Sequence, residues 1–332
     1  MQDLSGSVIK TLSRRSVIGT LLASAAIAPA RSAIVNLVAV GKDGWLFPIW
    51  DEVRHVDLKR LGGVVEVLNG TVDILKRANI QIVFAVTPVK SRVYRELLPD
   101  DFKFSAEADQ RYARGIEELR RSGALVADLL APLVAFRAAN PGEPVFFKGD
   151  THWTGGGSQA AATELARLIQ QKSHLQASAK PGTVVGSPTS VSWSKNDLAA
   201  LLPPADAAKY AAETYRLRQP IEGAGLIDDD KADVVVVGNS FMQPRLGFAS
   251  MLSNRLNRPV SLAWKVHQFG PYQTLLGFLG SDSFRRDKPG IIVWNLHEID
   301  LLIPADAKDG WGQNAIAPQA FLTKLRQVTG VG

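Results

Sequence analysis

The chain has 332 residues, of which 46% are hydrophobic and 21% are charged, as is ordinary for a globular protein of one large or two small domains. Its formal net charge is +6, and the first 33 residues supply half of it with four basic side chains against one acidic side chain. The remainder is too weakly basic to indicate a nucleic-acid-binding protein. Because cysteine is absent, a thiol nucleophile, a cysteine-ligated zinc site and disulfide bonds are excluded.

The N-terminal 33 residues have the layout of an export signal. Arg14 and Arg15 precede an apolar stretch at positions 17–28, and small-residue sites suited to signal peptidase follow at 28–30 and 31–33. The stretch is about 12 residues long, whereas a membrane-spanning helix needs roughly 20. We expect a twin-arginine export signal and a periplasmic location, with a tether to the inner membrane if the signal stays uncleaved. The alternative is a basic N-terminal helix of a cytosolic protein.

Beyond residue 33, segments with helical spacing alternate with buried apolar runs. A short apolar run at 34–40 leads into a turn at 41–44. Apolar periodicity predicts helices over residues 58–79, 106–122, 130–138, 155–171 and 318–328. Strands are expected at 80–86, 124–129, 234–237 and 291–296, with an edge strand at 259–262. Residues 178–194 are rich in Ser, Thr, Gly and Pro and lack a period, which favours a surface insertion or lid.

Alternation of helices with buried strands predicts an α/β fold, a doubly wound parallel sheet with helices on both faces. Nothing marks a boundary after residue 33, so we expect one domain over residues 34–332. Open parallel sheets bind ligands outside the carboxyl ends of their strands. Segments 87–90, 238–241 and 295–300 fall there, and we expect them to form one site with the loop that carries Asp150 and His152.

Ser240, His152 and Asp150 are the parts of a nucleophilic acyl-transfer site. Ser240 follows a strand of valines, where a turn would expose its hydroxyl. His152 would accept the serine proton, and Asp150 would orient the imidazole and stabilise it when it is protonated. The non-catalytic alternatives are a helix N-cap for Ser240 and a structural turn for Asp150 and His152.

Metal binding is a rival interpretation of the same loop. Asp-x-His also occurs in iron sites built from two histidines and one carboxylate. The third ligand would come from another histidine, and the sequence selects none among His55, His174, His267 and His297. We expect neither a metal nor another cofactor for the acyl-transfer chemistry.

Five stretches in chain order carry a resemblance to a known family: residues 41–47, 87–90 with Tyr94 and Pro99, 150–154, 238–241, and 270–273 with 294–298. They resemble the alginate O-acetyltransferase family, periplasmic proteins with an SGNH-hydrolase-like fold that acetylate exopolysaccharides. The most specific element is Asp150-Thr151-His152-Trp153, which precedes the serine and so implies a permuted motif order. The resemblance implies Ser240 as the nucleophile, His152 as the base and Asp150 as its orienting acid. Asn239 departs from the commoner Gly-Asp-Ser pattern of the superfamily.

Six further residues are candidates for substrate binding: Asn239, Lys90, Tyr94, Arg245, Trp153 and Tyr272. Asn239 would help to bind the oxyanion, and Lys90 and Tyr94 would line the cleft near an anionic sugar. Arg245 would steer a carboxylated substrate, and Trp153 would stack on a sugar face. Tyr272 belongs to one of the stretches that carry the resemblance. The alternatives are a surface lysine, a packed tyrosine, a core tryptophan and an arginine on a solvated helix. His297 is a weaker candidate for the base, since its neighbour Glu298 would point to the opposite side of an extended segment.

The leading hypothesis is a periplasmic polysaccharide O-acetyltransferase that works through an acetyl-serine. The resemblance implies a membrane-bound acyltransferase as the acetyl donor, an exported polysaccharide as the acceptor, and other export-complex subunits as possible partners. Two alternatives remain open: an esterase that uses the same three residues, and a non-catalytic polysaccharide-binding or scaffold subunit.

Overall fold

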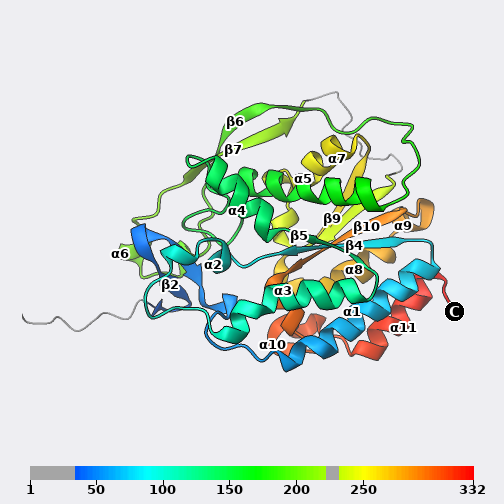
Figure 1. Cartoon of the computed structure of the whole chain (residues 1–332), viewed down its shortest axis with the longest axis horizontal. Coiled ribbons are helices and arrows are strands. Elements are labelled where there is room, and N and C mark those ends of the chain that lie inside the picture. Colours follow the sequence, from blue (N-terminus) through cyan, green and yellow to red (C-terminus); the bar gives the residue numbers. More distant parts are fainter. Residues whose placement is uncertain (1–33, 222–231) are drawn as a thin grey trace, which may run out of the picture. The chain divides into compact units, whose positions relative to one another are not determined.

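A five-stranded parallel sheet crosses the centre of the protein (Figure 1). The computed structural model describes residues 34–221 and 232–332, so the expected export signal lies outside the described residues. The strands are β4 (Gln81–Thr87), β5 (Leu125–Asp128), β8 (Val234–Gly238), β9 (Val260–Trp264) and β10 (Ile291–His297). They lie in the order β5-β4-β10-β8-β9, which places the last strand of the chain at the centre. All five were expected, and β9 is an edge strand as predicted.

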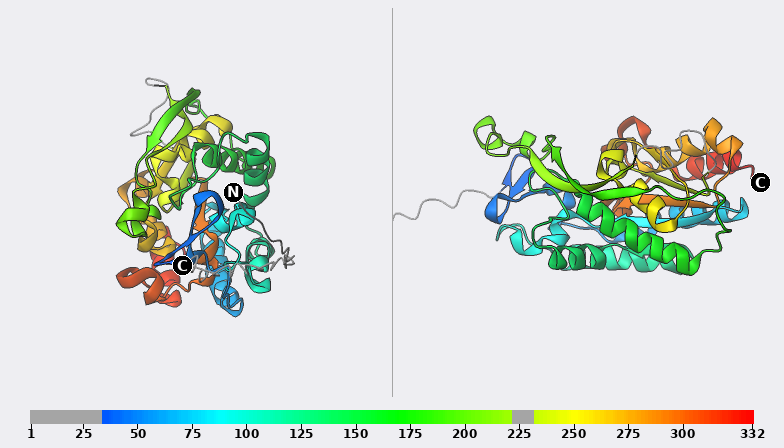
Figure 2. Two further views of the ribbon diagram at one scale, coloured as in Figure 1. Left: turned by 90° about the vertical axis from the view of Figure 1, so that its left-hand side faces the viewer. Right: turned by 90° about the horizontal axis from the view of Figure 1, so that it is seen from above.

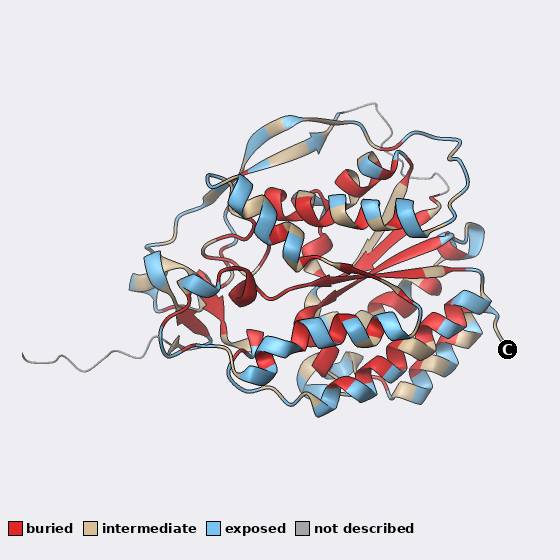
Figure 3. Ribbon diagram, in the orientation of Figure 1, coloured by how far each residue is buried: buried red, intermediate tan, exposed pale blue. Residues whose placement is uncertain are grey.

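Helices cover both faces of this sheet because alternate residues of each strand point to opposite sides. Val83, Val236 and Val293 pack against α4 (Leu130–Ala139), α5 (Gly155–Lys172) and α7 (Phe248–Leu256). Phe84, Val237 and Trp294 face the other core. That core is formed by α1 (Lys59–Arg77), α3 (Ala106–Arg121), α8 (Pro271–Leu279) and α11 (Pro318–Thr329). Strands β4, β8 and β10 are buried on both sides, whereas the edge strand β9 is partly exposed (Figure 3). The predicted doubly wound α/β fold is confirmed.

Residues 178–194 are mostly exposed, as expected of a surface insertion, but they are not without regular structure. They contain β6 (Val185–Trp193), which pairs antiparallel with β7 (Glu213–Pro220). The pair lies beside α5, above the parallel sheet in Figures 1 and 2. Polar residues dominate β6 because most of its side chains are at least partly exposed. A strand with no buried face shows no apolar alternation, which is why the sequence pattern missed it.

The remaining elements are short. An antiparallel sheet near residue 34 holds β1 (Ile34–Val35), β2 (Val38–Val40) and β3 (Leu46–Pro48). Short helices are α2 (Lys90–Val93), α6 (Pro204–Ala207), α9 (Asp282–Arg286) and α10 (Lys308–Trp311). Within the described residues, no helix combines the length and the apolar character needed to cross a membrane.

Candidate active site

Ser240 lies where β8 ends and a 3₁₀ turn, η5 (Ser240–Met242), begins. Asn239 caps this turn, because its side-chain oxygen accepts a hydrogen bond from the Phe241 amide at 3.0 Å. Gly238 is required before it, since a Cβ there would come within 2.8 Å of the Asn295 Cβ on the neighbouring strand β10. The turn leaves Ser240 half-buried, so its hydroxyl is held at the end of a rigid strand but remains reachable.

Asp150, His152 and Ser240 form a continuous chain of hydrogen bonds. Nδ1 of His152 lies 2.7 Å from Oδ1 of Asp150, and Nε2 lies 2.8 Å from Oγ of Ser240. A carboxylate can only accept, so Nδ1 carries the proton and Nε2 is free to accept the serine hydroxyl. The structure thus brings together the three side chains that the sequence singled out, in the order that proton transfer from Ser240 requires.

Asp150 is a buried carboxylate that is held by four donors. Oδ1 accepts from the backbone N–H and the ring Nδ1 of His152, and Oδ2 accepts from Trp193 Nε1 at 3.0 Å and the Asp197 amide at 3.1 Å. Burial opposes ionisation, but the bonds and the charge of His152, aided by Trp193, hold the pKa of Asp150 below its usual range. Asp150 is therefore ionised and fixed in orientation.

The loop that carries Asp150 and His152 is anchored along its whole length. Glu213, at the start of β7, accepts from the amides of Lys148 and Gly149, each at 2.7 Å. Asp197 accepts from the Thr151 amide at 2.7 Å. Further backbone bonds join the loop to residues 46, 147 and 199. Asp197 and Glu213 lie on either side of α6, and their side chains hold this loop in place.

Lys90 is neither a surface charge nor a cleft residue, so the expected substrate-binding role is wrong. Its side chain is 1% exposed, and Nζ donates to the carbonyls of Lys148 and Asp150, each at 3.0 Å. The ammonium also lies over the rings of Trp45 and Phe47. Burial lowers the pKa of Lys90 to about 8, against the opposing charges of Glu213 and other carboxylates. Lys90 supports the loop from inside the protein.

Three aromatic candidates are core residues, so their expected role in substrate binding is wrong and the alternatives of a packed tyrosine and a core tryptophan are confirmed. Tyr94 is 2% exposed and its hydroxyl accepts from the Val145 amide. Trp153 is fully buried, and its Nε1 donates to the Phe241 carbonyl at 2.9 Å, which ties the loop to the Ser240 turn. Tyr272 packs on Trp294 and Phe321 at the opposite face of the sheet, away from Ser240.

Two of the candidates keep an accessible polar group near the site. Arg245 is exposed, and its guanidinium lies 5.1 Å from the ring centre of Trp193, whose Nε1 binds Asp150. Asn239 is nearly buried and uses its side-chain oxygen as the cap of the Ser240 turn, and among the described residues its Nδ2 makes no hydrogen bond. That amide is therefore available as a donor beside Ser240.

The residues that sequence reasoning missed are Trp193, Asp197 and Glu213. Each contacts the Asp150 loop, and each comes from the segment around β6 and β7. Their spacing along the chain forms no motif, because a side chain can support a loop from any segment that the fold places beside it. The strand pairing of β6 with β7, had it been recognised, is the signal that would have placed them near one another.

His297 is a poor base because it is buried and faces aromatic rings. Burial lowers its pKa to about 4, although the Asp300 charge opposes this, and the ring stacks on Phe241 at 5.3 Å. The Glu298 side chain pairs with Arg92 and Arg111 rather than with His297, although Glu298 begins a 3₁₀ helix and does not continue the strand. None of the four other histidines joins the one group of potential metal ligands among the described residues, which is Asp150, His152 and Asp197. A metal there would have to displace the hydrogen bonds of His152.

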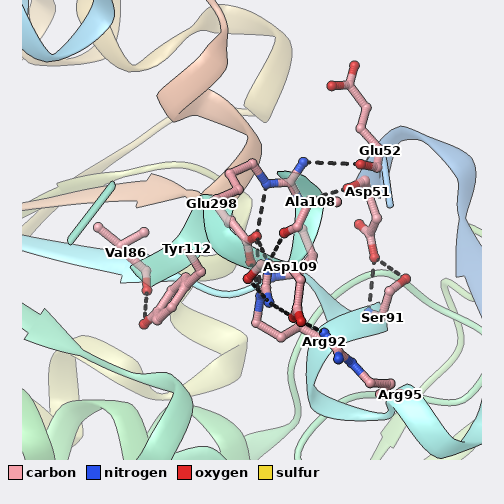
Figure 4. Close-up of polar contacts among 12 residues, drawn as sticks. Asp51, Glu52, Val86, Ser91, Arg92, Arg95, Ala108, Asp109, Tyr112 and Glu298 are labelled. Carbon is pink, nitrogen blue, oxygen red and sulfur yellow. Dashed lines mark hydrogen bonds and ion pairs between the residues drawn. The ribbon is translucent and has the colours of Figure 1, made fainter. Parts of the chain in front are cut away.

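A buried ion cluster supports the same end of the sheet (Figure 4). Glu298 accepts from Arg92 at 2.6 Å and Arg111 at 2.9 Å, and its other oxygen accepts from the Val89 amide. Burial disfavours its charge, but Arg111 and Arg92 outweigh this and lower the pKa of Glu298 to about 2. The cluster fixes the turn after β4 from which Lys90 reaches the Asp150 loop.

Comparison with known proteins agrees with this arrangement. Residues 38–298 match the profile of a family described as "SGNH hydrolase-like domain, acetyltransferase AlgX". A probable alginate O-acetylase AlgJ from Pseudomonas syringae pv. tomato is 28% identical over 259 residues, which cover 74% of this chain and 64% of that protein. The chain therefore spans less than two thirds of that relative's length.

Two solved structures share the fold. The O-acetyltransferase domain of Pseudomonas putida AlgJ superposes with a TM-score of 0.71 at 26% identity, covering 87% of this chain and 98% of that domain. Pseudomonas aeruginosa AlgX has a TM-score of 0.64 at 19% identity, covering 89% and 67%, and supports the fold alone.

Proposed function

The chain belongs to the AlgX family of SGNH-hydrolase-like acetyltransferases, and on that premise we propose that it transfers acetyl groups to polysaccharide hydroxyls through Ser240. The observation that carries the proposal is the chain of hydrogen bonds from Asp150 through His152 to Ser240. Ser240 is at the carboxyl end of a central strand, where open parallel sheets place their reactive groups.

In the first half of the reaction, His152 Nε2 takes the hydroxyl proton as Oγ of Ser240 attacks the acetyl carbonyl of the donor. A C–O bond to Ser240 forms, the bond from the carbonyl carbon to the leaving group breaks, and the leaving group receives the proton from His152. Asp150 keeps the imidazole oriented and stabilises its charged form between the two transfers.

In the second half, the hydroxyl of a sugar replaces the leaving group. His152 accepts the sugar proton as the sugar oxygen attacks the acetyl-serine. The new sugar ester forms, the bond from the acetyl carbon to Oγ breaks, and Ser240 regains its proton from His152. The same chemistry with water as the acceptor is hydrolysis, so the transferase differs from an esterase only in which nucleophile reaches the acetyl-serine.

The negative charge that develops on the acetyl oxygen needs donors near Ser240. The backbone N–H of Ser240 and the Nδ2 of Asn239 are the groups we assign to this task. Asn239 is suited to it because its oxygen is already fixed by the Phe241 amide, so its amide nitrogen is held in one orientation. Arg245, exposed beside Trp193, is the group we assign to acceptor binding.

We place this activity in the periplasm, after export by the N-terminal signal. The acetyl donor is proposed to be a membrane-bound acyltransferase that passes acetyl groups to Ser240. Alginate is the first acceptor to test, because AlgJ relatives carry it in their names.

The test uses the purified protein, p-nitrophenyl acetate and oligomers of mannuronate, with Ser240→Ala as the matched variant. We expect an acetyl group on the oligomer by mass spectrometry with the wild type and none with the variant. Ester cleavage that depends on Ser240 but never acetylates a sugar would favour an esterase. The absence of cleavage and of acetyl-enzyme would favour a non-catalytic polysaccharide-binding or scaffold subunit.

A further inference from the structure

A second carboxylate, Asp197, lies beside the base on the same side as Asp150. Its Oδ2 is 3.7 Å from Nδ1 of His152. Two bonds hold it there: Oδ1 accepts from the Thr151 amide at 2.7 Å, and its own amide donates to Oδ2 of Asp150 at 3.1 Å. Asp197 is therefore locked to the backbone of the loop that carries His152.

Asp197 differs from Asp150 in its exposure and in its bonding. All of the Asp150 carboxylate is buried and engaged by four donors. The Asp197 side chain is 40% exposed, and its Oδ2 faces His152 without a donor of its own at hydrogen-bond distance. The charged groups that face Asp197 are Asp150, His152 and Lys90. A charge at this position acts on the imidazole through space, across less than 4 Å.

We propose that Asp197 is a positioning residue that shares with Asp150 the stabilisation of His152 when its ring carries two protons. This rests on the proposed function, in which His152 holds the proton between the departure of the leaving group and the attack of the acceptor. Asp150 fixes the orientation of the ring through Nδ1, and Asp197 adds a second negative charge without taking the proton.

The electrostatics of Asp197 agree with this role above pH 6. Burial, followed by the charge of Asp150, raises the pKa of Asp197 to about 6, while the His152 charge opposes the rise. The negative charge of Asp150 therefore disfavours a second negative charge on Asp197. Above pH 6, Asp197 is ionised and favours a protonated imidazole. As the pH falls through 6, Asp197 takes up a proton and its help to His152 fades.

The first test measures the His152 ring directly, so that it does not depend on catalysis. Protein with ¹⁵N-labelled histidine is titrated by NMR, and the His152 signals are assigned by comparison with His152→Gln. In Asp197→Asn the acceptor for the Thr151 amide is kept while the charge is removed. We expect the midpoint of the His152 titration to fall by roughly half to one pH unit.

Glu213→Gln is the matched control. Glu213 braces the same loop through the amides of Lys148 and Gly149, but it is not a neighbour of Nδ1 of His152. We expect this variant to leave the His152 midpoint in place. An unchanged midpoint in Asp197→Asn, or an equal shift in Glu213→Gln, would overturn the proposal and leave Asp197 as a loop anchor.

The second test uses the pH dependence of kcat/KM for acetylation of the enzyme by p-nitrophenyl acetate. The acidic limb of the profile should move to lower pH in Asp197→Asn, and kcat at neutral pH should fall roughly threefold to tenfold. A drop in kcat with an unmoved limb would contradict the proposal. If wild-type Ser240 never gains an acetyl group, the proposed function fails, whereas the NMR titration still decides the role of Asp197.

Discussion

Ser240 is placed by the parallel sheet, whereas Asp150 and His152 are placed by a loop that other segments hold from outside. The serine follows a strand paired on both sides, with a glycine that permits contact with β10. The loop is closed by a single antiparallel bridge between Phe146 and Trp153. Lys90, Asp197 and Glu213 hold it further from other segments. The comparison indicates that changes near Ser240 alter chemistry while the fold survives, and changes around the loop alter the orientation of the base.

The largest effect is expected at the strand end. Ser240→Ala removes the nucleophile but leaves a half-buried turn intact, so acetyl transfer should fall by at least ~10³-fold while the melting temperature changes little. Steady-state kinetics and thermal unfolding measure the two. Retention of transfer in this variant would show that another residue carries the acetyl group.

The buried ion cluster of Glu298, Arg92 and Arg111 should contribute mainly to the stability of the fold. Glu298→Gln leaves Arg92 and Arg111 without their buried partner, and we expect a loss of about 3–5 kcal/mol in the free energy of unfolding. Urea denaturation of the variant measures this loss. Asp282→Asn, which breaks an exposed ion pair, is the control and should leave the urea midpoint almost unchanged.

The lowered pKa of Glu298 predicts that the folded protein loses stability in acid. The folded pKa of Glu298 is about 2, below its ordinary value of 4.5, so its contribution is present above pH 4.5 and is lost as the pH falls towards 2. Denaturation midpoints measured from pH 7 to pH 2 should decline most steeply in that window. Glu298→Gln should flatten the decline, and an equally steep curve would assign the acid sensitivity to other carboxylates.

Lys90→Met tests the loop from the inside. The variant keeps the bulk of the chain but loses both bonds to the loop carbonyls, so we expect kcat to fall by up to roughly 100-fold as His152 loses its alignment. Lys76→Met, an exposed lysine on α1, is the control and should leave kcat unchanged. Full activity in Lys90→Met would mean that the loop is held without this support.

The smallest effect is expected for Trp193→Phe, which tests the support from β6. The ring that stacks on Phe147 is largely kept, while the donor to Oδ2 of Asp150 is lost. Three donors to Asp150 remain, so we expect kcat to fall only threefold to tenfold, roughly the worth of one hydrogen bond to a charged group. A larger drop would show that the indole is needed for more than this bond.

The same two regions separate what the sequence could and could not predict. The sheet strands and helices such as α1 and α5 were predictable because their apolar patterns are local. The first turn of α5 also packs closely, since a Cβ at Gly155 or Gly157 would lie 2.2 Å from a carbonyl oxygen. Helix α8 spans only nine residues, so the stripe of Tyr272, Leu275, Leu276 and Leu279 covers little more than two turns. It was missed for that reason.

Some residues of the candidate site could be predicted from the sequence and others could not. Ser240, His152 and Asp150 are recognisable because their residue types and order are constrained by the chemistry. Lys90 and Tyr94 were misjudged because burial depends on packing that spacing along the chain does not encode. Asp197 and Trp193 were missed because they reach the loop through the pairing of β6 with β7, which carries no hydrophobic pattern.

The most direct test of the account is to mix the protein with p-nitrophenyl acetate, quench within the first turnover, and locate the acetyl group by peptide mass spectrometry. The account predicts an initial burst of p-nitrophenol and an acetyl group on Ser240, with both lost in His152→Gln. A burst with the acetyl group on another residue, or an acetyl-Ser240 that forms equally fast in His152→Gln, would contradict it.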